Sequence, residues 1–342
     1  MRAGPVRFIL FRPRVIVMPD ARHVRDWDDQ LILASSAVGV GELWQTADGK
    51  AAYYLGGSSG RAAGSSGEQL LFRTSGKVTV PLTSSITILD GGRVYWDHSE
   101  NLAHFKKTND RDFYIGRAVG DASSGTIVVD LNQDPRYDID MRRDGCLTVL
   151  VGTQAVGGFG EPKLRGGAQS LELTATAEAQ KVDILSVDGF ATGANAIIEA
   201  IIRVPDDGAG TVVDFNIGVA NGTHASDADA ITESIFFHLD ANNTNINAES
   251  DDGTTEVAAT DTTKDYTEGS AVANRVHLWI DMRTPADCQL YVEGVNVLPA
   301  TTFNVNVAAG PWFLLAHLEK SSAADVYRVV VDELRARFAE QG

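Results

Sequence analysis

The sequence predicts an all-β protein with two folded domains. Apolar residues come in short β-branched or aromatic runs, separated at intervals of about ten by Gly, Asn, Asp and Ser, which is typical of strands joined by turns. Helical periodicity is scarce by comparison. The chain has 342 residues, 33 of them glycine, and a single hydrophobic core stops growing at roughly 250 to 300 residues. Two domains are therefore expected.

Composition divides the chain into four segments. Residues 1–25 contain six arginines against one acidic residue, Asp20, and form a basic N-terminal arm. Residues 152–169 hold six glycines and one proline, which is typical of a linker between domains. The first domain then spans residues 26–151. The second spans residues 170–342, and its strands predict a two-sheet sandwich.

Strands of the first domain are expected where apolar runs lie between turn residues. They fall at residues 51–55, 69–73, 77–81, 93–96, 103–106, 113–118 and 126–131. Residues 56–67 read GGSSGRAAGSSG, and a Gly/Ser segment behaves as a flexible coil. This segment is predicted to be a long exposed loop.

Strands of the second domain follow the same pattern. They are expected at residues 170–174, 183–187, 196–204, 211–219, 234–240, 245–249, 276–282, 288–292, 312–319 and 327–334. The few segments that favour helix are residues 20–33, 226–231 and the tail 333–341, whose Ala-Arg-Phe-Ala-Glu composition has helical propensity.

Charge and composition exclude several classes of protein. The 29 basic and 46 acidic residues give a formal charge of −17, which repels nucleic acid and anionic membranes. No apolar run approaches the roughly 18 to 20 residues of a membrane-spanning helix, and no uninterrupted signal-peptide core is present. Cys146 and Cys288 lie too far apart for a metal-ligand motif and are predicted to be buried free thiols.

Sequence motifs predict no catalytic residue and no enzymatic activity. The chain has no GxxxxGK[ST], GxGxxG, HExxH, GxSxG or CxxC motif. A glycosidase needs two carboxylates about 5 to 9 Å apart. In Asp332-Glu333 the side chains point to opposite faces of a strand, and Asp240 with Glu249 and Asp251 is interpreted as a solvated acidic surface.

No metal site and no cofactor are predicted, with calcium left as an open alternative in the acidic region. Asp240, Asn242 and Asp251 offer the oxygen ligands that this ion prefers. The spacing matches a calcium loop poorly, because Asn245 stands where such a loop needs glycine.

Tryptophans divide into core and contact positions. Trp279 and Trp312 lie within apolar strand patterns, so core packing is expected for both. Trp27 lies between aspartates and is the better candidate for contact with a partner.

Residues 76–131 resemble a family of small β-barrel proteins from the head-gene clusters of tailed phages, described as capsid decoration or capsid-fibre proteins. The resemblance rests on GKVTVP at 76–81, GGRVYW at 91–96, IGRA at 115–118 and GTIVVDL at 125–131, and extends weakly upstream to about Ala34. It implies an N-terminal β-barrel domain and a role on the outside of a virus capsid.

The second half resembles, more loosely, the concanavalin-like jelly-roll sandwiches used as lectin and laminin-type modules. RVHLWIDM at 275–282, CQLYVEGV at 288–295 and the strand at 326–334 carry this resemblance. The ExDxxE strand of the laminarinase-type hydrolases is missing. The predicted architecture is therefore a small β-barrel followed by a jelly-roll sandwich.

Together these features favour a structural virion protein that decorates or cements a tailed-phage capsid. The arm would dock on the major capsid protein by adding a strand to a sheet edge, and the acidic sandwich would face outward. Contact candidates are Arg2, Arg7, Arg12, Arg14 and Trp27. The expected state is a trimer on the outer capsid surface of the virion, after synthesis in the host cytoplasm.

Two other functions compete with this interpretation. A lectin-like module would bind surface glycans through the loops of the sandwich. A polysaccharide-active enzyme has weaker support, because no carboxylate pair stands out.

Overall fold

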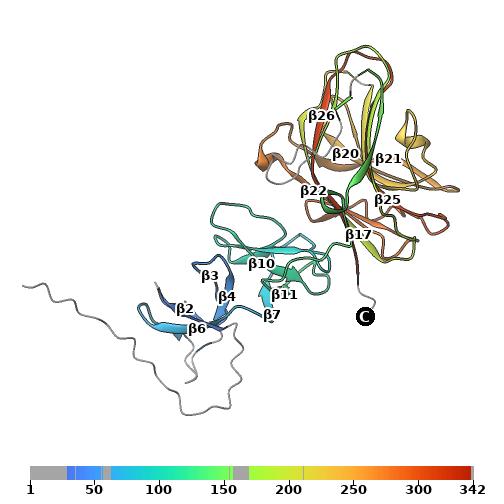
Figure 1. The fold of residues 1–342 in the computed structure, drawn as a ribbon. Coiled ribbons are helices and arrows are strands. Elements are labelled where there is room, and N and C mark those ends of the chain that lie inside the picture. The colour runs from blue at the N-terminus through green and yellow to red at the C-terminus, as the bar shows by residue number, and fades with distance from the viewer. Residues whose placement is uncertain are drawn as a thin grey trace, which may run out of the picture.

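The computed structural model describes residues 29–34, 36–54, 56, 63–153, 155–156, 169–210 and 212–339. The predicted all-β fold is confirmed, because the elements are almost entirely antiparallel strands. A smaller N-terminal unit and a larger C-terminal sandwich lie end to end (Figure 1). The basic arm, with its four arginine candidates, and Trp27 lie outside the described residues.

The N-terminal unit contains three antiparallel sheets. A four-stranded sheet has the order β1-β6-β4-β3, with strands Asp29–Leu33, Gln69–Arg73, Ala51–Tyr54 and Leu43–Gln45. A five-stranded sheet has the order β7-β11-β10-β8-β9, with strands Lys77–Pro81, Thr126–Leu131, Phe113–Ala118, Arg93–Asp97 and Leu102–His104. The short strands β2 (Val38–Gly39) and β5 (Ala63–Gly64) pair with each other.

The sandwich consists of two larger sheets. The eight-stranded sheet has the order β14-β15-β26-β17-β22-β23-β24, with strands Ala155–Val156, Gln169–Leu173, Tyr327–Phe338, Ala196–Asp206, Val276–Asp281, Gln289–Val292 and Val295–Val297. Its eighth strand, β12 (Ile139–Asp140), pairs with β26 and precedes the short helix α1 (Met141–Asp144).

The seven-stranded sheet forms the other layer. It has the order β13-β16-β25-β18-β19-β20-β21, with strands Cys146–Val151, Gln180–Ser186, Phe313–Lys320, Val213–Ala220, Glu233–Asp240, Asn245–Asp252 and Glu256–Asp265. The 3₁₀ turns η1 (Ala228–Ala230) and η2 (Val272–Asn274) lie in its connections and in those of the facing sheet.

The main core lies between the two sheets of the sandwich. Alternate residues of each strand face inward, so that Phe215, Ile217 and Leu318 pack against Ile198 and Ile202 of the other layer. Trp312 is fully buried in this core, as its apolar surroundings in the sequence predict. Its indole nitrogen donates to Thr192 Oγ1 at 2.9 Å, which satisfies the one polar atom of the side chain.

A second core joins the two units. It contains the apolar residues of the N-terminal five-stranded sheet together with Ile197, Trp279 and Tyr291 of the sandwich. The rings of Phe105 and Trp279 meet edge to face with centroids 5.2 Å apart. Trp279 is thus buried, as predicted, but at the junction of the units.

In the three segments with helical propensity, the described residues form no α-helix; residues 20–28 and 340–341 lie outside the described part of the chain. The tail from Glu333 to Phe338 is part of β26, and residues 29–33 form β1. The segment 226–231 contains only the 3₁₀ turn η1. In the tail, pairing of β26 with β17 and β15 outweighs local propensity, because this strand supplies both hydrogen bonds and core residues.

Several other segments differ from the division expected from the sequence. Cys146–Val151 pairs with β16 and belongs to the sandwich, whereas the sequence placed it in the first domain. Of the Gly/Ser segment, residues 57–62 lie outside the described part, and Ala63–Gly64 forms β5. Both cysteines are free thiols; Cys288 is buried, and Cys146 is partly exposed. Among the described residues, no helix is long and apolar enough to span a membrane.

Candidate functional site

The outer face of the seven-stranded sheet carries charged side chains. In each central strand the residues that face the core are apolar, while the alternate residues on the other side are polar in one half of the sheet and apolar in the other half. These outward residues come in pairs two positions apart, so both members of a pair share one face. The pairs are Lys181 and Asp183 on β16, His317 and Glu319 on β25, Asp214 and Asn216 on β18, and His238 and Asp240 on β19.

Strand register aligns these pairs into two rows. Asp183 lies opposite His317, which lies opposite Asn216. Asn216 in turn lies opposite His238. The second row contains Lys181, Glu319, Asp214 and Asp240 in the same strand order. Residues that are 134 positions apart in the chain, such as Asp183 and His317, become neighbours only through this pairing.

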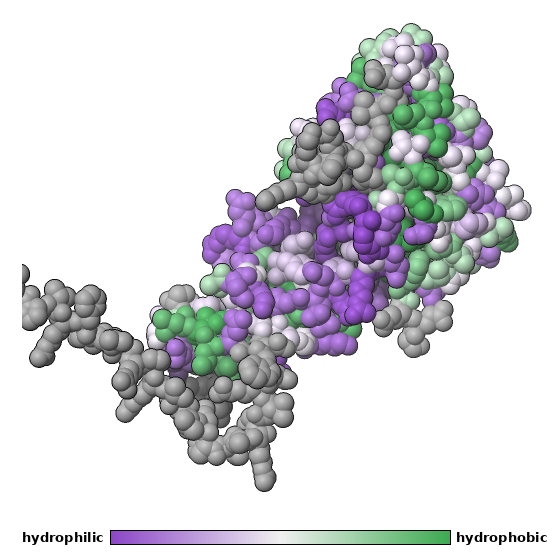
Figure 2. Space-filling view, in the orientation of Figure 1, coloured by the Kyte–Doolittle hydropathy of each residue, from purple (hydrophilic) through white to green (hydrophobic). Residues whose placement is uncertain are grey.

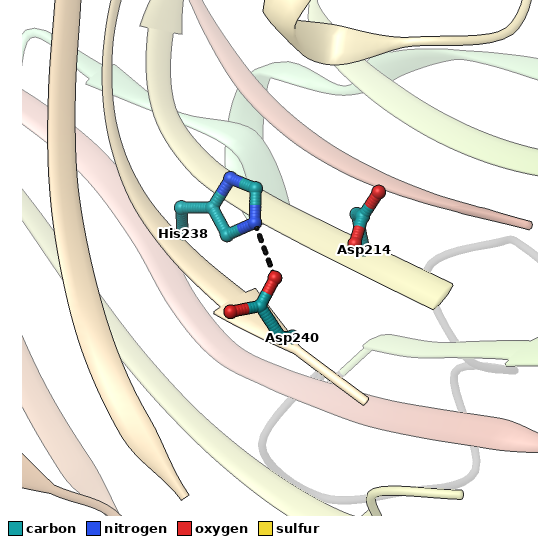
Figure 3. Close-up of side chains that lie close together, drawn as sticks. All are labelled: Asp214, His238 and Asp240. Atoms are coloured by element: carbon teal, nitrogen blue, oxygen red, sulfur yellow. Dashed lines mark hydrogen bonds and ion pairs between the residues drawn. The ribbon is translucent and has the colours of Figure 1, made fainter. Parts of the chain in front are cut away.

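His238 lies at the centre of the exposed end of the rows. Its Nε2 atom is 2.9 Å from Asp240 Oδ1, and Figure 3 shows Asp214 on the same side of the sheet. Its other ring nitrogen, Nδ1, lies 3.4 Å from Glu249 Oε2 and 3.7 Å from Asp229 Oδ1. We call Asn216, Asp229, His238, Asp240 and Glu249 the His238 cluster. The imidazole thus faces carboxylates from two directions.

The connection between β18 and β19 brings Asp229 to the cluster. Residues 221–232 fold back over the outer face, where Ala228 and Ile231 pack with Phe236 and Leu315. At its other end Lys181 Nζ contacts the carbonyl oxygen of His224. The connection therefore buries the inner part of the polar rows and leaves the side chain of Asp229 54% exposed and that of Asp240 41% exposed.

Asn216 is the buried floor of the cluster. Its side-chain amide nitrogen donates to Glu249 Oε1 at 2.5 Å and lies 3.1 Å from His238 Nδ1. The amide oxygen is fully buried and has no hydrogen-bond partner among the residues that the structure describes. A half-turn of the amide would place this oxygen beside His238 Nδ1 and Glu249.

The carboxylates of the cluster stabilise the protonated, positively charged form of His238. Burial alone would lower the pKa of His238, but hydrogen bonds with Asp229, Asp240 and Glu249 outweigh it and raise that pKa to about 12. Burial raises the pKa of Glu249. Four carboxylates, with Asp214 included, surround one imidazolium, so the site retains a negative excess that favours a cation.

A second histidine is enclosed deeper in the rows. His317 is fully buried, with Nδ1 2.6 Å from Asp183 Oδ1 and Nε2 2.8 Å from Glu319 Oε2. Burial acts to lower the pKa of His317, yet the two carboxylates raise it to about 9. Lys181 Nζ lies 3.1 Å from the other oxygen of Asp183. This inner group is an internally neutralised network, so it serves structure.

The donor set of the His238 cluster fits a divalent cation that displaces the proton from His238 Nδ1, because a protonated ring nitrogen cannot be a ligand. His238 Nδ1, Asp229 and Glu249 have ligand atoms within 4.8 Å of one another. Asp240 accepts from the opposite ring nitrogen, and this second contact is the usual way in which a carboxylate orients a metal-binding imidazole. A donor set of one nitrogen and several oxygens suits Mn²⁺ or Zn²⁺ better than Ca²⁺, because calcium prefers ligands that are all oxygen.

The structure does not assemble the three calcium candidates named from the sequence. Asp240 belongs to the His238 cluster. The backbone N–H of Asn242 donates to the carbonyl of Asp207. Asp251 lies opposite Ser234 at the far end of β19, and its carboxylate accepts from the N–H of Gly253. Six residues of strand, roughly 20 Å, separate Asp251 from Asp240.

Sequence reasoning missed both histidines of the site. Each of them is followed by an acidic residue two positions later, in His238-Leu-Asp240 and His317-Leu-Glu319. Such polar pairs on one face of otherwise apolar strands are the signal that could have found them. Asp229 had no local signal, because only the folded connection places it there.

No known family model matches the chain, and no curated protein matches it. Solved structures match the sandwich. One, from work on endo-acting O-glycanases of the human gut microbiota that initiate mucin breakdown, is 12% identical, with 60% of this chain and 100% of that chain covered and a TM-score of 0.41.

Two further solved structures are glycan-related proteins. The carbohydrate recognition domain of Emp47p is 10% identical, with 56% of this chain and 88% of that chain covered and a TM-score of 0.36. A carbohydrate esterase from Shiga toxin-encoding bacteriophage phi24B is 12% identical, with 56% and 90% covered and a TM-score of 0.36. The chain is thus similar to carbohydrate-recognition and glycan-active sandwich domains.

This similarity corrects the sequence-based prediction that the chain is not an enzyme. The prediction excluded enzymatic activity and is wrong, because the similar solved structures include an O-glycanase and a carbohydrate esterase. These three matches carry no argument about the function of this chain, because their identities are 10 to 12% and none reaches a TM-score of 0.5. Function therefore has to be argued from the residues of this chain.

Proposed function

We propose that this chain is a carbohydrate-binding protein whose sandwich recognises a glycan at the His238 cluster. The observation that carries the proposal is the convergence of Asp229, His238 and Glu249, from a connection and two strands, on the exposed end of the polar rows. Sugar hydroxyls donate hydrogen bonds readily, and ionised carboxylates are strong acceptors for them.

Hydrogen bonds from neighbouring side chains hold the carboxylates of the His238 cluster in place. Asp240 is held by His238 Nε2 and by Asn247 Nδ2 at 3.2 Å, while Glu249 is held by Asn216. These contacts orient the acceptors before a ligand arrives, which lowers the entropy cost of binding.

A divalent cation would strengthen this site. It would take His238 Nδ1, Asp229 and Glu249 as ligands and use the Asn216 oxygen after the half-turn of its amide. The ion would neutralise the excess of carboxylates and offer its remaining positions to vicinal hydroxyls of a sugar.

The proposal predicts cation-dependent glycan binding. On a glycan array the full chain should bind a defined subset of oligosaccharides in the presence of Mn²⁺ or Zn²⁺, and EDTA should weaken that binding at least about tenfold. The double variant Asp229→Asn, Glu249→Gln should lose it, because two charged ligands are removed at constant size.

The matched control is Asp251→Asn, on the same strand as Glu249 but outside the His238 cluster. It should leave the array pattern unchanged. A blank array, or a pattern that the double variant retains, would contradict the proposal. Calorimetry with Mn²⁺, Zn²⁺ and Ca²⁺ measures cation binding independently of glycan binding. Glycan binding by a chain that binds none of these cations would contradict the proposed role of the metal.

A second candidate function is attachment to the outer surface of a tailed-phage capsid. The observation that favours it is an apolar stripe on the N-terminal unit, formed by Leu31 (67% exposed), Leu33 (64%) and Leu71 (49%). Leu31 and Leu71 are register partners on β1 and β6, and β1 pairs with no other described strand. Figure 2 shows hydrophobic residues gathered on this part of the surface.

In this candidate the stripe, with the preceding basic arm, would contact the major capsid protein, and the chain would sit on the virion as a trimer. Leu31→Ser with Leu71→Ser should then reduce co-sedimentation with heads purified from the source strain by about tenfold or more, with little change in Tm, since exposed residues contribute little to folding. Equal co-sedimentation of the variant and the native chain would remove this candidate.

A further inference from the structure

We infer that the cleft between the two units binds a saccharide that carries a carboxylate. The cleft has a volume of about 620 Å³ and takes its walls from both units. Arg93, Tyr95 and Lys106 line it from the N-terminal side, and Arg275, His277 and Arg335 line it from the sandwich. This volume lies in the range of small-molecule sites in proteins.

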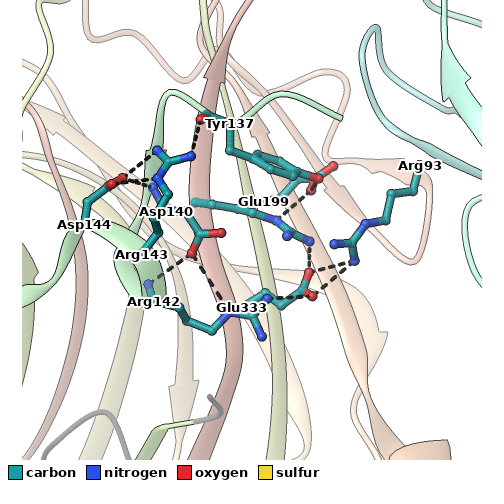
Figure 4. Close-up of polar contacts among 9 residues, drawn as sticks. Arg93, Tyr137, Asp140, Arg142, Arg143, Asp144, Glu199 and Glu333 are labelled. Atoms are coloured by element: carbon teal, nitrogen blue, oxygen red, sulfur yellow. Dashed lines mark hydrogen bonds and ion pairs between the residues drawn. The ribbon is translucent and has the colours of Figure 1, made fainter. Parts of the chain in front are cut away.

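Guanidinium groups outnumber carboxylates along one side of the cleft. Arg93 donates to both oxygens of Glu333 at 3.1 Å, and Arg142 donates to the same carboxylate at 3.2 Å (Figure 4). The second carboxylate, Glu199, accepts from Arg337 at 2.6 Å and from Arg335 at 3.3 Å. The lining acids Glu199 and Glu333 thus face the lining arginines Arg93, Arg335 and Arg337, which leaves a positive excess.

Further cations lie at the rim. The side chains of Arg93 and Lys106 are each 31% exposed, and that of Arg275 is 39% exposed. Lys107 is exposed and makes no ion pair with any of the described residues. In a chain of formal charge −17, this local positive potential would draw an anionic ligand to the cleft. Figure 2 shows that hydrophilic residues gather where the two units meet.

Aromatic rings supply the apolar part of the cleft. Phe105 packs edge to face against both Trp279 and His277, with centroid distances of 5.2 and 5.3 Å, and Tyr95 stands beside Tyr114 at 5.5 Å. Rings next to cations fit a ligand with an apolar C–H face and an attached negative charge, which is the chemistry of a uronic acid.

The pKa of His277 reflects the positive charges that line the cleft. Burial, followed by the nearby charges of Lys106, Arg275 and Arg93, lowers the pKa of His277 to about 3, while Glu199 opposes this effect. Glu293, which pairs with Lys106, accepts from the backbone N–H of His277. The imidazole is therefore neutral near pH 7, and a bound carboxylate nearby would raise its pKa.

This cleft is distinct from the His238 cluster. His277 and Arg335 belong to the eight-stranded sheet, whereas His238 lies on the outer face of the seven-stranded sheet. Loss of one site therefore leaves the other intact, and the two proposals can fail separately.

The test is calorimetric titration of the full chain with D-glucuronate and with D-glucose at low salt, where charge effects are least screened. Glucuronate should bind at least about tenfold more tightly than glucose. The variants Arg275→Gln and Lys107→Gln should each weaken glucuronate binding by roughly five- to tenfold. In both variants Asp332 keeps its contact with Arg203 at 2.7 Å, so the fold is retained.

The control variant is Lys77→Gln, an exposed lysine on β7 that does not line the cleft. It should leave glucuronate binding unchanged. In NMR titrations of imidazole resonances, glucuronate should raise the pKa of His277, and glucose should not. Equal binding of the two sugars, no binding of either, or sulfate binding as tightly as glucuronate would each overturn the proposal.

Discussion

Glu199→Ala should destabilise the protein by about 3 to 5 kcal/mol, because it leaves buried cations without a counter-charge. Glu199 is almost completely buried on β17 and accepts from Arg337, Arg335 and the hydroxyl of Tyr137, the last at 2.6 Å. The guanidinium of Arg335 also lies over the Tyr137 ring, 3.9 Å from its centroid. Arg335 also pairs with Glu333, whereas Glu199 is the one carboxylate paired with Arg337 among the described residues.

Chemical denaturation measures this effect, and an exposed ion pair serves as the control. Glu172 and Arg328 lie 3.6 Å apart with side chains 37% and 48% exposed, so Glu172→Ala should cost less than about 1 kcal/mol. Similar losses for both variants would contradict the assignment of Glu199 as a buried anchor.

The pKa of Glu199 predicts the acid side of the stability profile. Burial acts to raise this pKa, but Arg337 and Arg335 outweigh it and lower it to about 2. A depressed folded-state pKa gives stability that is present above the unfolded value, near 4.5, and is lost as pH falls toward 2. The Glu199→Ala variant should therefore lose less of its remaining stability between pH 5 and pH 2 than the native chain.

Stability should also fall on the alkaline side as His317 loses its proton. Burial acts to lower its folded-state pKa, but Asp183 and Glu319 outweigh burial and raise that pKa from the ordinary 6.5 to about 9. A raised folded-state pKa gives stability that is complete below the unfolded value and is lost as pH rises through the folded value. The difference corresponds to roughly 3 kcal/mol, lost between about pH 6.5 and pH 9.

Unfolding free energies measured from pH 6 to pH 10 test this prediction. His317→Gln should flatten the profile in that window, whereas His98→Gln, at an exposed position, should keep it. A native profile that stays level up to pH 9 would show that His317 is neutral in the folded protein.

Much of the fold follows from local patterns in the chain. Alternating apolar residues in VDFNIGV and SIFFHLD predict strands, and both form neighbours in the seven-stranded sheet. The tail could not be predicted in this way, because its helical composition is local whereas its partners β17 and β15 lie far away in sequence. Tertiary pairing decided that segment.

Much less of the candidate site than of the fold could be predicted from the sequence. Asp240 and Glu249 were interpreted as part of a solvated acidic surface, whereas the structure places both beside His238. Their neighbours Asn216 and Asp229 come from another strand and from a connection, so strand order had to be known first. The positive cleft depends on the packing of two units, and no pattern within one segment encodes it.

Hydrogen–deuterium exchange of the full chain, with and without the tightest oligosaccharide from the array, tests the central claim most directly. The account predicts slower exchange in residues 214–249, which contain β18, the connection with Asp229, β19 and Glu249. Protection confined to residues 29–131, or no oligosaccharide that alters exchange anywhere, would contradict it.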